Sequence, residues 1–389
     1  MTRAGLEEYA AAVRERYLAA RKKEKGHILD EFCQTAGIHR KAAIRLLRGT
    51  PRCSEPQRKK KGRPVRYGPE LLEPLRQIWD VSDRLSGKLL VAVMKDLVAS
   101  LERHCELELA PGVREALCAM SAATIDRRIA LLRRRLGRQP RRRAPATTGL
   151  KAQIPIRTWS EWAGVRPGSV QADLVLHSGE SPEGFYLTTL TVIDVATGWI
   201  EPRPALGTGM TRVRQALQRS ALALPFALRE LHTDNGSEFI NHSLQGWCYQ
   251  HAVRFTRGRS YRKNDQAYVE QRNWLGVRRV IGYDRYSSRN AFAALDRLYD
   301  LLRLQLNFLR PVRKLIGKQR HGAKVTKIYD APRTPYQRLL ESEALDEATR
   351  ERLEKQFVAI NPAGLQRRIE EALRRLWDCT ERKENRKVG

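Results

Sequence analysis

The chain has 389 residues, with 73 Lys or Arg against 43 Asp or Glu, and its formal net charge is +30. At a prior of ~150 residues per domain, this length predicts two or three domains. No run of about 18 apolar residues is present to cross a bilayer, and Glu7, Glu8 and Glu15 interrupt the stretch that an export signal needs. We therefore expect a cytoplasmic protein with no membrane insertion and with a polyanionic partner.

Two acid-free basic runs, residues 58–66 and 133–143, concentrate the positive charge. We interpret both as linkers that lie along phosphates, with a solvated charged tether as the alternative. Basic charge alone does not distinguish DNA from RNA, a ribosome or an anionic membrane. The six cysteines and eight histidines have no spacing typical of zinc ligands, so we interpret the cysteines as reduced packing residues.

Residues 1–55 have the pattern of a helix-turn-helix module. Apolar residues recur at helical spacing from Leu6 to Gly49, with a break at positions 36–38. Residues 28–35 would be the supporting helix and residues 39–48 the recognition helix, although other three-helix domains share this outline. From this placement we expect three side chains to contact DNA, which are Arg40, Lys41 and Arg45.

A basic linker, residues 56–68, and a second helical module, residues 69–136, follow. The linker contains Lys61-Gly62-Arg63-Pro64, which is close to the minor-groove core of AT-hook peptides and makes Arg63 a candidate DNA contact. Breaks near 86–87 and 110–112 divide the second module. Ser121 is placed to cap a basic helix that carries Arg127 and Arg128, so we expect a second DNA-binding helix-turn-helix there.

Residues 137–160 are rich in Arg, Pro, Thr and Gly, and they predict a linker before a third region, residues 161–310. The pattern predicts strands at 170–175, 185–195 and 199–203, a helix at 211–224, a strand at 228–233, a helix at 242–251, a strand at 253–256 and a long helix from about 266. This order is close to that of the α/β ribonuclease H-like fold, a mixed five-stranded sheet with helices on both faces.

Three acids fall where this fold brings chain segments together. Asp173 lies in the first strand, Asp234 directly follows the fourth, and Glu270 lies one turn into the long helix. Carboxylates from separate elements are what phosphodiester cleavage by two metal ions needs, and Mg²⁺ prefers such oxygen ligands. We therefore expect Asp173, Asp234 and Glu270 to be catalytic residues and metal ligands.

The motifs around two of these acids carry a resemblance to a known family. Asp234 and Glu270 are separated by 35 residues, and the motifs are His232-Thr233-Asp234-Asn235-Gly236-Ser237-Glu238-Phe239 and Tyr261-Arg262-Lys263-Asn264-Asp265-Gln266-Ala267-Tyr268-Val269-Glu270-Gln271-Arg272-Asn273. The chain resembles the DDE integrase and transposase superfamily, above all bacterial insertion-sequence transposases with a retroviral-integrase-like core. A tail at residues 333–340 is similar to theirs as well.

The resemblance implies a bacterial DNA transposase at the nucleoid. Such an enzyme binds the element's ends, nicks them, and joins the 3′-hydroxyls to target DNA with two Mg²⁺ ions, for which Mn²⁺ substitutes. Its partners would be the transposon ends and the target DNA, and pairing two ends implies a homo-oligomer on DNA. A ribonuclease H-like nuclease without strand transfer and a non-catalytic DNA-binding regulator derived from a transposase are the alternatives.

Other acids compete with the first member of the triad. Asp194 also follows a strand-like run, but Asp194 to Trp199 is typical of a hairpin turn, so we favour Asp173. Glu238 and Asp265 are further candidates. We expect Glu238 to begin a helix and Asp265 to cap one.

The sequence departs from the retroviral pattern in two respects. It has no His/Cys zinc module, and Trp274 and Val277 stand where those integrases have lysines. Arg262 and Lys263 precede the glutamate helix, and we expect them to order around a DNA end. For Arg272, Arg278 and Arg279 on the same helix, DNA contact and a solvated helix face both remain open. Residues 311–389 form a basic and helical C-terminal region. Its helical stretch from Leu345 to Arg386 packs on the core, bridges subunits or binds DNA, and the sequence leaves these alternatives open.

Overall fold

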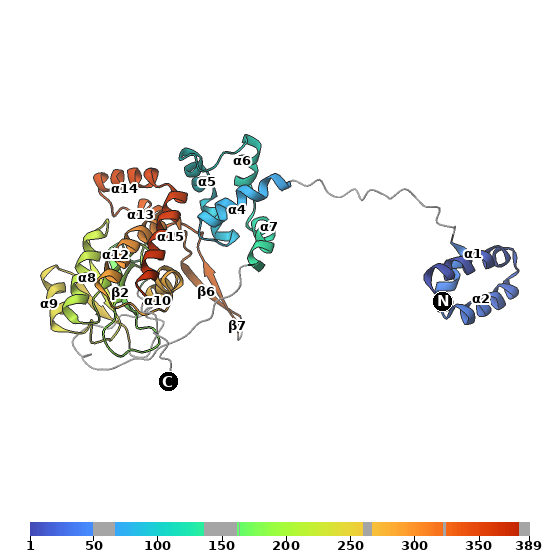
Figure 1. Ribbon diagram of the computed structural model, residues 1–389, viewed down its shortest axis with the longest axis horizontal. Helices are drawn as coiled ribbons and strands as arrows, with labels where there is room; N and C mark the ends of the chain where they lie inside the picture. The colour runs from blue at the N-terminus through green and yellow to red at the C-terminus, as the bar shows by residue number, and fades with distance from the viewer. Residues whose placement is uncertain (50–66, 136–161, 163, 260–266, 322–323, 381–389) are drawn as a thin grey trace, which may run out of the picture. The chain divides into compact units, whose positions relative to one another are not determined.

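The computed structural model describes residues 1–49, 67–135, 162, 164–259, 267–321 and 324–380. The chain divides into two compact units, Met1–Arg66 and Tyr67–Gly389 (Figure 1). None of the helices in these ranges is both long and apolar enough to cross a membrane.

The first unit is a bundle of three helices. Its elements are α1 (Arg3–Ala19), α2 (Lys22–Ala36) and α3 (Arg40–Arg48). Helix α2 ends at Gly37, whose φ of 64° is a left-handed conformation that glycine adopts without strain. Phe32 and Leu47 are fully buried between the helices. The break predicted at positions 36–38 is confirmed.

The second unit begins with a helical module that has its own core. Its elements are η1 (Pro69–Leu71), α4 (Leu72–Val81), α5 (Gly87–Arg103), α6 (Pro111–Cys118) and α7 (Ala122–Arg135). Ile78, Leu90 and Val98 are fully buried in it. The Ser121 Oγ accepts a hydrogen bond of 3.3 Å from the Thr124 backbone N–H, so the predicted cap is confirmed.

A mixed sheet lies at the centre of the second unit. Its strands are β1 (Ser169–Leu176), β2 (Thr188–Asp194), β3 (Ile200–Ala205), β4 (Glu230–Thr233) and β5 (Arg254–Arg257), in the order β3-β2-β1-β4-β5. The first three strands are antiparallel, whereas β4 and β5 run parallel to β1. This is the topology of the ribonuclease H-like fold, as the sequence predicted.

Helices cover both faces of this sheet, since every residue of β2 and β3 is buried although strand side chains alternate between faces. The covering elements are α8 (Met210–Ala223), α9 (His242–Gln250), α10 (Ala267–Asn273), η4 (Trp274–Arg278), α11 (Arg279–Ile281), α12 (Arg289–Leu304) and η5 (Gln305–Leu309). Helices α8 and α12 pack on β3, while α10 packs on β1 and β2.

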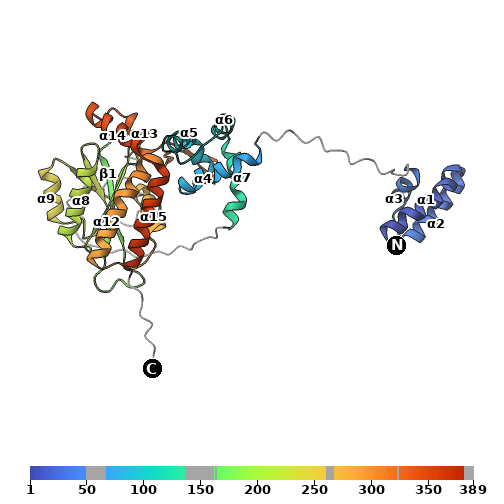
Figure 2. The same cartoon turned by 45° about the horizontal axis from the view of Figure 1, so that its top comes forward.

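The C-terminal region contributes to the core. It consists of β6 (Leu315–His321), β7 (Lys324–Tyr329), α13 (Pro335–Leu340), α14 (Glu347–Ala359) and α15 (Pro362–Asp378). Helix α15 lies against α12 (Figure 2), and its Leu365, Ile369 and Leu376 are buried in the core of the sheet domain. Of the three possibilities left open by the sequence, packing on the core therefore holds for α15.

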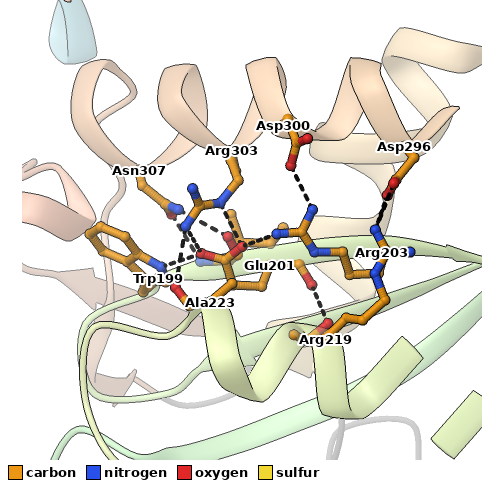
Figure 3. A network of polar contacts seen from close by, with 11 residues as sticks. Trp199, Glu201, Arg203, Arg219, Ala223, Asp296, Asp300, Arg303 and Asn307 are labelled. Carbon is orange, nitrogen blue, oxygen red and sulfur yellow. Dashed lines mark hydrogen bonds and ion pairs between the residues drawn. The ribbon is translucent and has the colours of Figure 1, made fainter. Parts of the chain in front are cut away.

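A polar network fixes the edge strand β3 to the helices beside it (Figure 3). The fully buried Glu201 carboxylate accepts bonds of 2.7 and 2.6 Å from Arg303 of α12 and one of 2.9 Å from the Trp199 indole. Asn307 pairs with both backbone groups of Ile200, at 2.9 Å each, as a neighbouring strand would. The edge of the sheet is thereby closed by side chains.

The helical module is joined to the sheet domain by a partly exposed cluster of charges. Asp83, in the α4–α5 turn, accepts bonds of 2.8 and 2.9 Å from Arg279 of α11 and a further bond from Arg310. Ser100 donates a bond of 3.0 Å to the Ile360 carbonyl at the other side of the contact. These bonds explain why the two parts form one unit.

Candidate active site

Asp173 lies in the middle of β1, opposite Thr191 of β2. Its Oδ1 accepts a hydrogen bond of 2.9 Å from the Leu174 backbone N–H, and its Oδ2 accepts one of 2.7 Å from the Asn273 side-chain amide. The carboxylate is therefore held in one orientation by the strand and by helix α10.

Asp234 follows the last residue of β4 and lies level with Asp173. The parallel register places Gln171 beside His232, and each acid is two residues further along its strand. Two residues along a strand return to the same face of the sheet. The Asp234 Oδ1 accepts a bond of 2.9 Å from the Gly236 backbone N–H, which fixes the turn after β4.

Glu270 is an exposed residue of α10, and this helix is attached to β1 on both sides of it. The Val269 backbone N–H donates a bond of 3.2 Å to Gln171, and Asn273 donates to Asp173. Residues three apart on a helix share a face, so Glu270 is on the side of α10 from which Asn273 reaches Asp173. The three predicted acids therefore come from elements that meet at one edge of the sheet.

The electrostatics of Asp173 reflect this convergence. Burial and, after it, the negative charges of Asp234, Glu270 and Glu238 together raise its pKa to about 7, against the Leu174 hydrogen bond, which lowers it. A like charge disfavours ionisation of a neighbouring carboxyl, whereas a bound cation would favour it. The carboxylate donors present here fit a divalent cation such as Mg²⁺. Within the described residues, no three potential ligands converge closely enough to form a finished ion site.

Glu238 belongs to the same acidic group, although the sequence favoured a place at the start of a helix. It lies in the turn 237–239, while helix α9 begins at His242 with Asn241 as its cap, so the expectation that Glu238 begins a helix is wrong. Its pKa is raised by burial and by the charge of Asp234. A Cβ on Gly236 would lie 2.5 Å from the Glu238 Cδ, so this glycine allows the carboxyl group to lie against the turn.

Asp194 occupies a different environment from Asp173. It is three residues along β2 from Thr191, the partner of Asp173, so it faces the other side of the sheet. Its carboxylate accepts bonds from the Gly168 N–H at 2.9 Å and from the Thr197 N–H and Oγ1 at 2.8 and 2.7 Å. Burial raises its pKa to about 6, against these bonds. The hairpin-turn interpretation agrees with this geometry.

The arginines that follow Glu270 make internal contacts. Arg272 is buried and donates a bond of 3.1 Å to the Gly198 carbonyl, and burial together with the charges of Arg310 and Arg338 lowers its pKa to about 9. For Arg272, the interpretation as part of a solvated or DNA-contacting face is wrong. Arg278 donates a bond of 2.7 Å to the Leu176 carbonyl, and Arg279 binds Asp83. Trp274 is 41% exposed and Val277 is buried.

The residues expected to contact DNA fall into three groups. On α3, Lys41 and Arg45 are exposed, whereas Arg40 forms an ion pair with Asp30. On α7, Arg127 bonds to Thr124 of its own helix at 3.3 Å, and Arg128 donates to the Tyr67 carbonyl. The remaining expected contacts, Arg63, Arg262 and Lys263, lie outside the described residues, as does most of both basic runs. Asp265, which was expected to cap a helix, also lies outside them.

Comparisons with known proteins agree with the topology and place the chain in a family. Residues 166–263 match the integrase core domain family. Over 331 residues the chain is 42% identical to uncharacterized protein y4rM of Sinorhizobium fredii (strain NBRC 101917 / NGR234). The match covers 85% of this chain and 94% of that protein. The chain belongs to the integrase core domain family of the DDE integrase and transposase superfamily.

Solved structures of retroviral proteins are similar to part of the chain. The HTLV-2 integrase catalytic core domain in complex with magnesium is 15% identical, with a TM-score of 0.29, and covers 38% of this chain and 92% of that one. The catalytic core domain of BIV integrase is 19% identical, with a TM-score of 0.29, and covers 45% and 95%.

Proposed function

We propose that this protein is a DNA transposase that binds the ends of its element, nicks them, and joins the 3′-hydroxyls to target DNA. The observation that carries the proposal is the convergence of Asp173, Asp234 and Glu270 from three separate elements, through the β1–β4 register and the contacts of α10 with β1. The charges of Asp234 and Glu270 raise the pKa of Asp173 in agreement with this placement. Membership of the integrase core domain family and a net charge of +30 support a polynucleotide substrate.

In this proposal Asp173, Asp234 and Glu270 hold two Mg²⁺ ions, with Mn²⁺ as a substitute. Bound ions of this kind supply activation of the attacking oxygen and neutralisation of charge on the phosphate. Asn273 positions Asp173 through its bond of 2.7 Å, and the Gly236 N–H positions Asp234. The contact of Val269 with Gln171 holds α10 on the strand, so that Glu270 keeps its place.

The DNA-binding parts remain proposals. Lys41 and Arg45 on the exposed side of α3, with Arg40, would read the element's ends, while Arg127 and Arg128 would contact DNA from α7. Arg63, Arg262 and Lys263 would act from the segments outside the described residues. We propose the organisation 1–55, 56–68, 69–136, 137–160, 161–310 and 311–389, with a homo-oligomer assembling on DNA in the bacterial cytoplasm, at the nucleoid.

The test uses a duplex that ends in the inverted repeat flanking the gene, with nicked and joined products separated on a gel. The wild type should nick and join this duplex in Mg²⁺. Glu270→Gln should bind the duplex with wild-type affinity and lose at least ~10³-fold in nicking, because it loses a ligand of the ions. Glu347→Gln, an exposed carboxyl of α14, is the matched control and should behave as the wild type.

Three outcomes would contradict the proposal. Retained strand transfer by Glu270→Gln would remove this residue from the site. Cleavage without joined products by the wild type would indicate a nuclease of the same fold. Sequence-specific binding without any nicking in Mg²⁺ or Mn²⁺ would indicate a DNA-binding regulator.

A further inference from the structure

A groove of about 250 Å³ lies between two loops of the sheet domain. The first loop, residues 182–186, precedes β2, and the second, residues 206–209, connects β3 to α8. Arg212 of α8 completes the wall. Pockets for drug-sized ligands have volumes of ~300–1,000 Å³, so this groove has room for one small group rather than for a large ligand.

The groove lies at the end of the sheet that also carries the candidate active site. Leu176, the last residue of β1, is opposite Thr188 of β2, and Thr188 is opposite Ala205 of β3. Both loops therefore flank the sheet at the level of Leu176, which is about 10 Å along β1 from Asp173. Asp234 follows the end of β4, which runs parallel to β1. A DNA strand held at these acids reaches the groove within a few nucleotides.

The first loop is fixed by one arginine. The Arg285 guanidinium donates four hydrogen bonds of 2.6–3.1 Å to backbone carbonyls, which belong to Ser178, Ser181, Glu183 and Phe185. A loop held in this way loses little conformational freedom when a ligand binds, so binding to it costs less free energy.

The second loop lies directly against the first. Gly207 has a φ of 84°, which favours glycine, and a Cβ at this position would lie 3.6 Å from the Phe185 ring. The Gly207 carbonyl accepts a bond of 2.8 Å from the Thr188 hydroxyl. The Arg212 guanidinium donates a bond of 2.5 Å to the Leu206 carbonyl. The groove is therefore preformed by contacts within the chain.

The groove presents an aromatic ring beside a cation. The Phe185 side chain is 47% exposed, and the Arg212 guanidinium carbon lies 5.9 Å from the centre of its ring. No Asp or Glu lines the groove, and Glu183 of the first loop is exposed outside it. An unpaired nucleotide offers a flat base to an aromatic side chain and a phosphate to an arginine. Its chemistry and its size therefore fit this groove.

We propose that the groove binds one unpaired nucleotide of single-stranded DNA, with the base stacked on Phe185 and a phosphate at Arg212. The proposal rests on the proposed function, because it takes DNA next to the cut as the ligand. Every base has a face that can stack, so the groove would hold a strand without reading its sequence. A contact with a second copy of the chain is the competing occupant.

The experiment compares the affinity of the full-length protein for a blunt duplex and for the same duplex with a short tail of unpaired thymidines, in EDTA. Tails at the 5′ end and at the 3′ end are measured separately. The wild type should bind one of the tailed duplexes roughly tenfold more tightly than the blunt duplex, which is the gain expected from stacking one base on an aromatic side chain.

Variants of Phe185 and Arg212 test the two contacts separately. Phe185→Leu should reduce the ratio of the two affinities to about 1, because leucine has no ring, whereas Phe185→Trp should keep the preference for the tail. Arg212→Gln should weaken binding of the tailed duplex and lower the magnitude of its slope of log K against log salt by about 0.7, since one phosphate contact to a single strand is lost.

The matched controls place the same changes outside the groove. Tyr249 of α9 is 88% exposed, and Arg352 of α14 is exposed as well. Tyr249→Leu and Arg352→Gln should keep the wild-type preference for the tail and the wild-type salt slope. Circular dichroism during thermal unfolding shows whether each variant is folded.

Equal affinity of the wild type for the blunt duplex and for both tailed duplexes would overturn the proposal. A preference for the tail that Phe185→Leu retains would overturn it as well. A changed oligomeric state of Phe185→Leu with the preference intact would assign the groove to a contact between copies of the chain.

Failure of this proposal is distinguishable from failure of the proposed function, because binding in EDTA needs no metal ion. A wild type that does not nick DNA in Mg²⁺ would refute the proposed function. The ratio of tailed to blunt affinity in the Phe185 variants would still test the groove.

Discussion

The carboxylates on the two sides of the central sheet differ in what surrounds them. Glu201 is buried against Arg303, and Asp194 accepts two hydrogen bonds from Thr197 within its own turn and one from the Gly168 N–H. Asp173, by contrast, is surrounded by the negative charges of Asp234, Glu270 and Glu238. Acids that hold the fold together are matched by donors, whereas acids gathered next to one another store repulsion that a cation relieves.

These surroundings distinguish Asp173 from Asp194 more clearly than the local sequence of either residue does. Both follow strand-like runs, and each has a raised pKa, about 7 for Asp173 and about 6 for Asp194. Burial is the largest cause in both cases. The second cause differs, because neighbouring acids raise the pKa of Asp173 while hydrogen bonds from Thr197 lower that of Asp194.

The largest expected effect comes from exchanging each aspartate for its amide. Asp173→Asn should lower metal-dependent nicking at least ~10³-fold while leaving the fold intact, since it removes a proposed ion ligand and one repelling charge. Asp194→Asn should keep nicking within a few-fold at a temperature where it stays folded. Single-turnover nicking rates, with circular dichroism as the check on folding, measure both. Equal losses in the two variants would remove the distinction between the aspartates.

A smaller effect is expected where the carboxylate has a structural partner. Glu201→Gln should lower the free energy of unfolding by about 3 kcal/mol, because it leaves the Arg303 guanidinium in a buried site without its counter-charge. Asp296→Asn breaks the more exposed pair with Arg219, drawn in the same network (Figure 3), and should cost less than about 1 kcal/mol. Denaturant titration of both variants measures the contrast. Equal losses in the free energy of unfolding would show that the buried pair stabilises the fold no more than the exposed one.

A still smaller effect concerns a buried group that must stay neutral. His177 is fully buried, its Nε2 lies 2.7 Å from the Thr189 hydroxyl, and burial lowers its pKa to about 3. Its unfolded pKa is near 6.5, so the stability it supports is present above about pH 6.5 and is lost as pH falls toward 3. Between about pH 6.5 and about pH 5 the free energy of unfolding should therefore fall by about 2 kcal/mol less in His177→Gln than in the wild type. Parallel pH slopes in the two proteins would contradict this assignment.

The sequence predicted the strand and helix order of the sheet domain, because buried strands and amphipathic helices have distinct apolar periods. It also indicated Asp234 and Glu270, through their motifs and spacing. It did not predict that the charge of Glu238 acts on Asp173, that Asn273 orients Asp173, or that Asp83 joins the helical module to α11. These relations depend on side chains brought together from distant positions, which local patterns do not encode.

The packing of the C-terminal helix was open for the same reason. Helix α15 shows an amphipathic pattern that any apolar surface would satisfy, and only the fold shows that α12 provides this surface. Asn307 is a similar case. Its pairing with both backbone groups of Ile200 joins residues that are 107 positions apart.

The central claim is that Asp173 and the acids around it form a divalent cation site. Asp194 and Glu201, which are matched by hydrogen-bond donors, are not part of such a site. Binding of Mn²⁺ to the protein–DNA complex, followed by the paramagnetic resonance signal of the free ion, tests this claim directly. The account predicts binding by the wild type and by Asp194→Asn, and loss of binding in Asp173→Asn and in Asp234→Asn. Undiminished Mn²⁺ binding by the last two variants would contradict it.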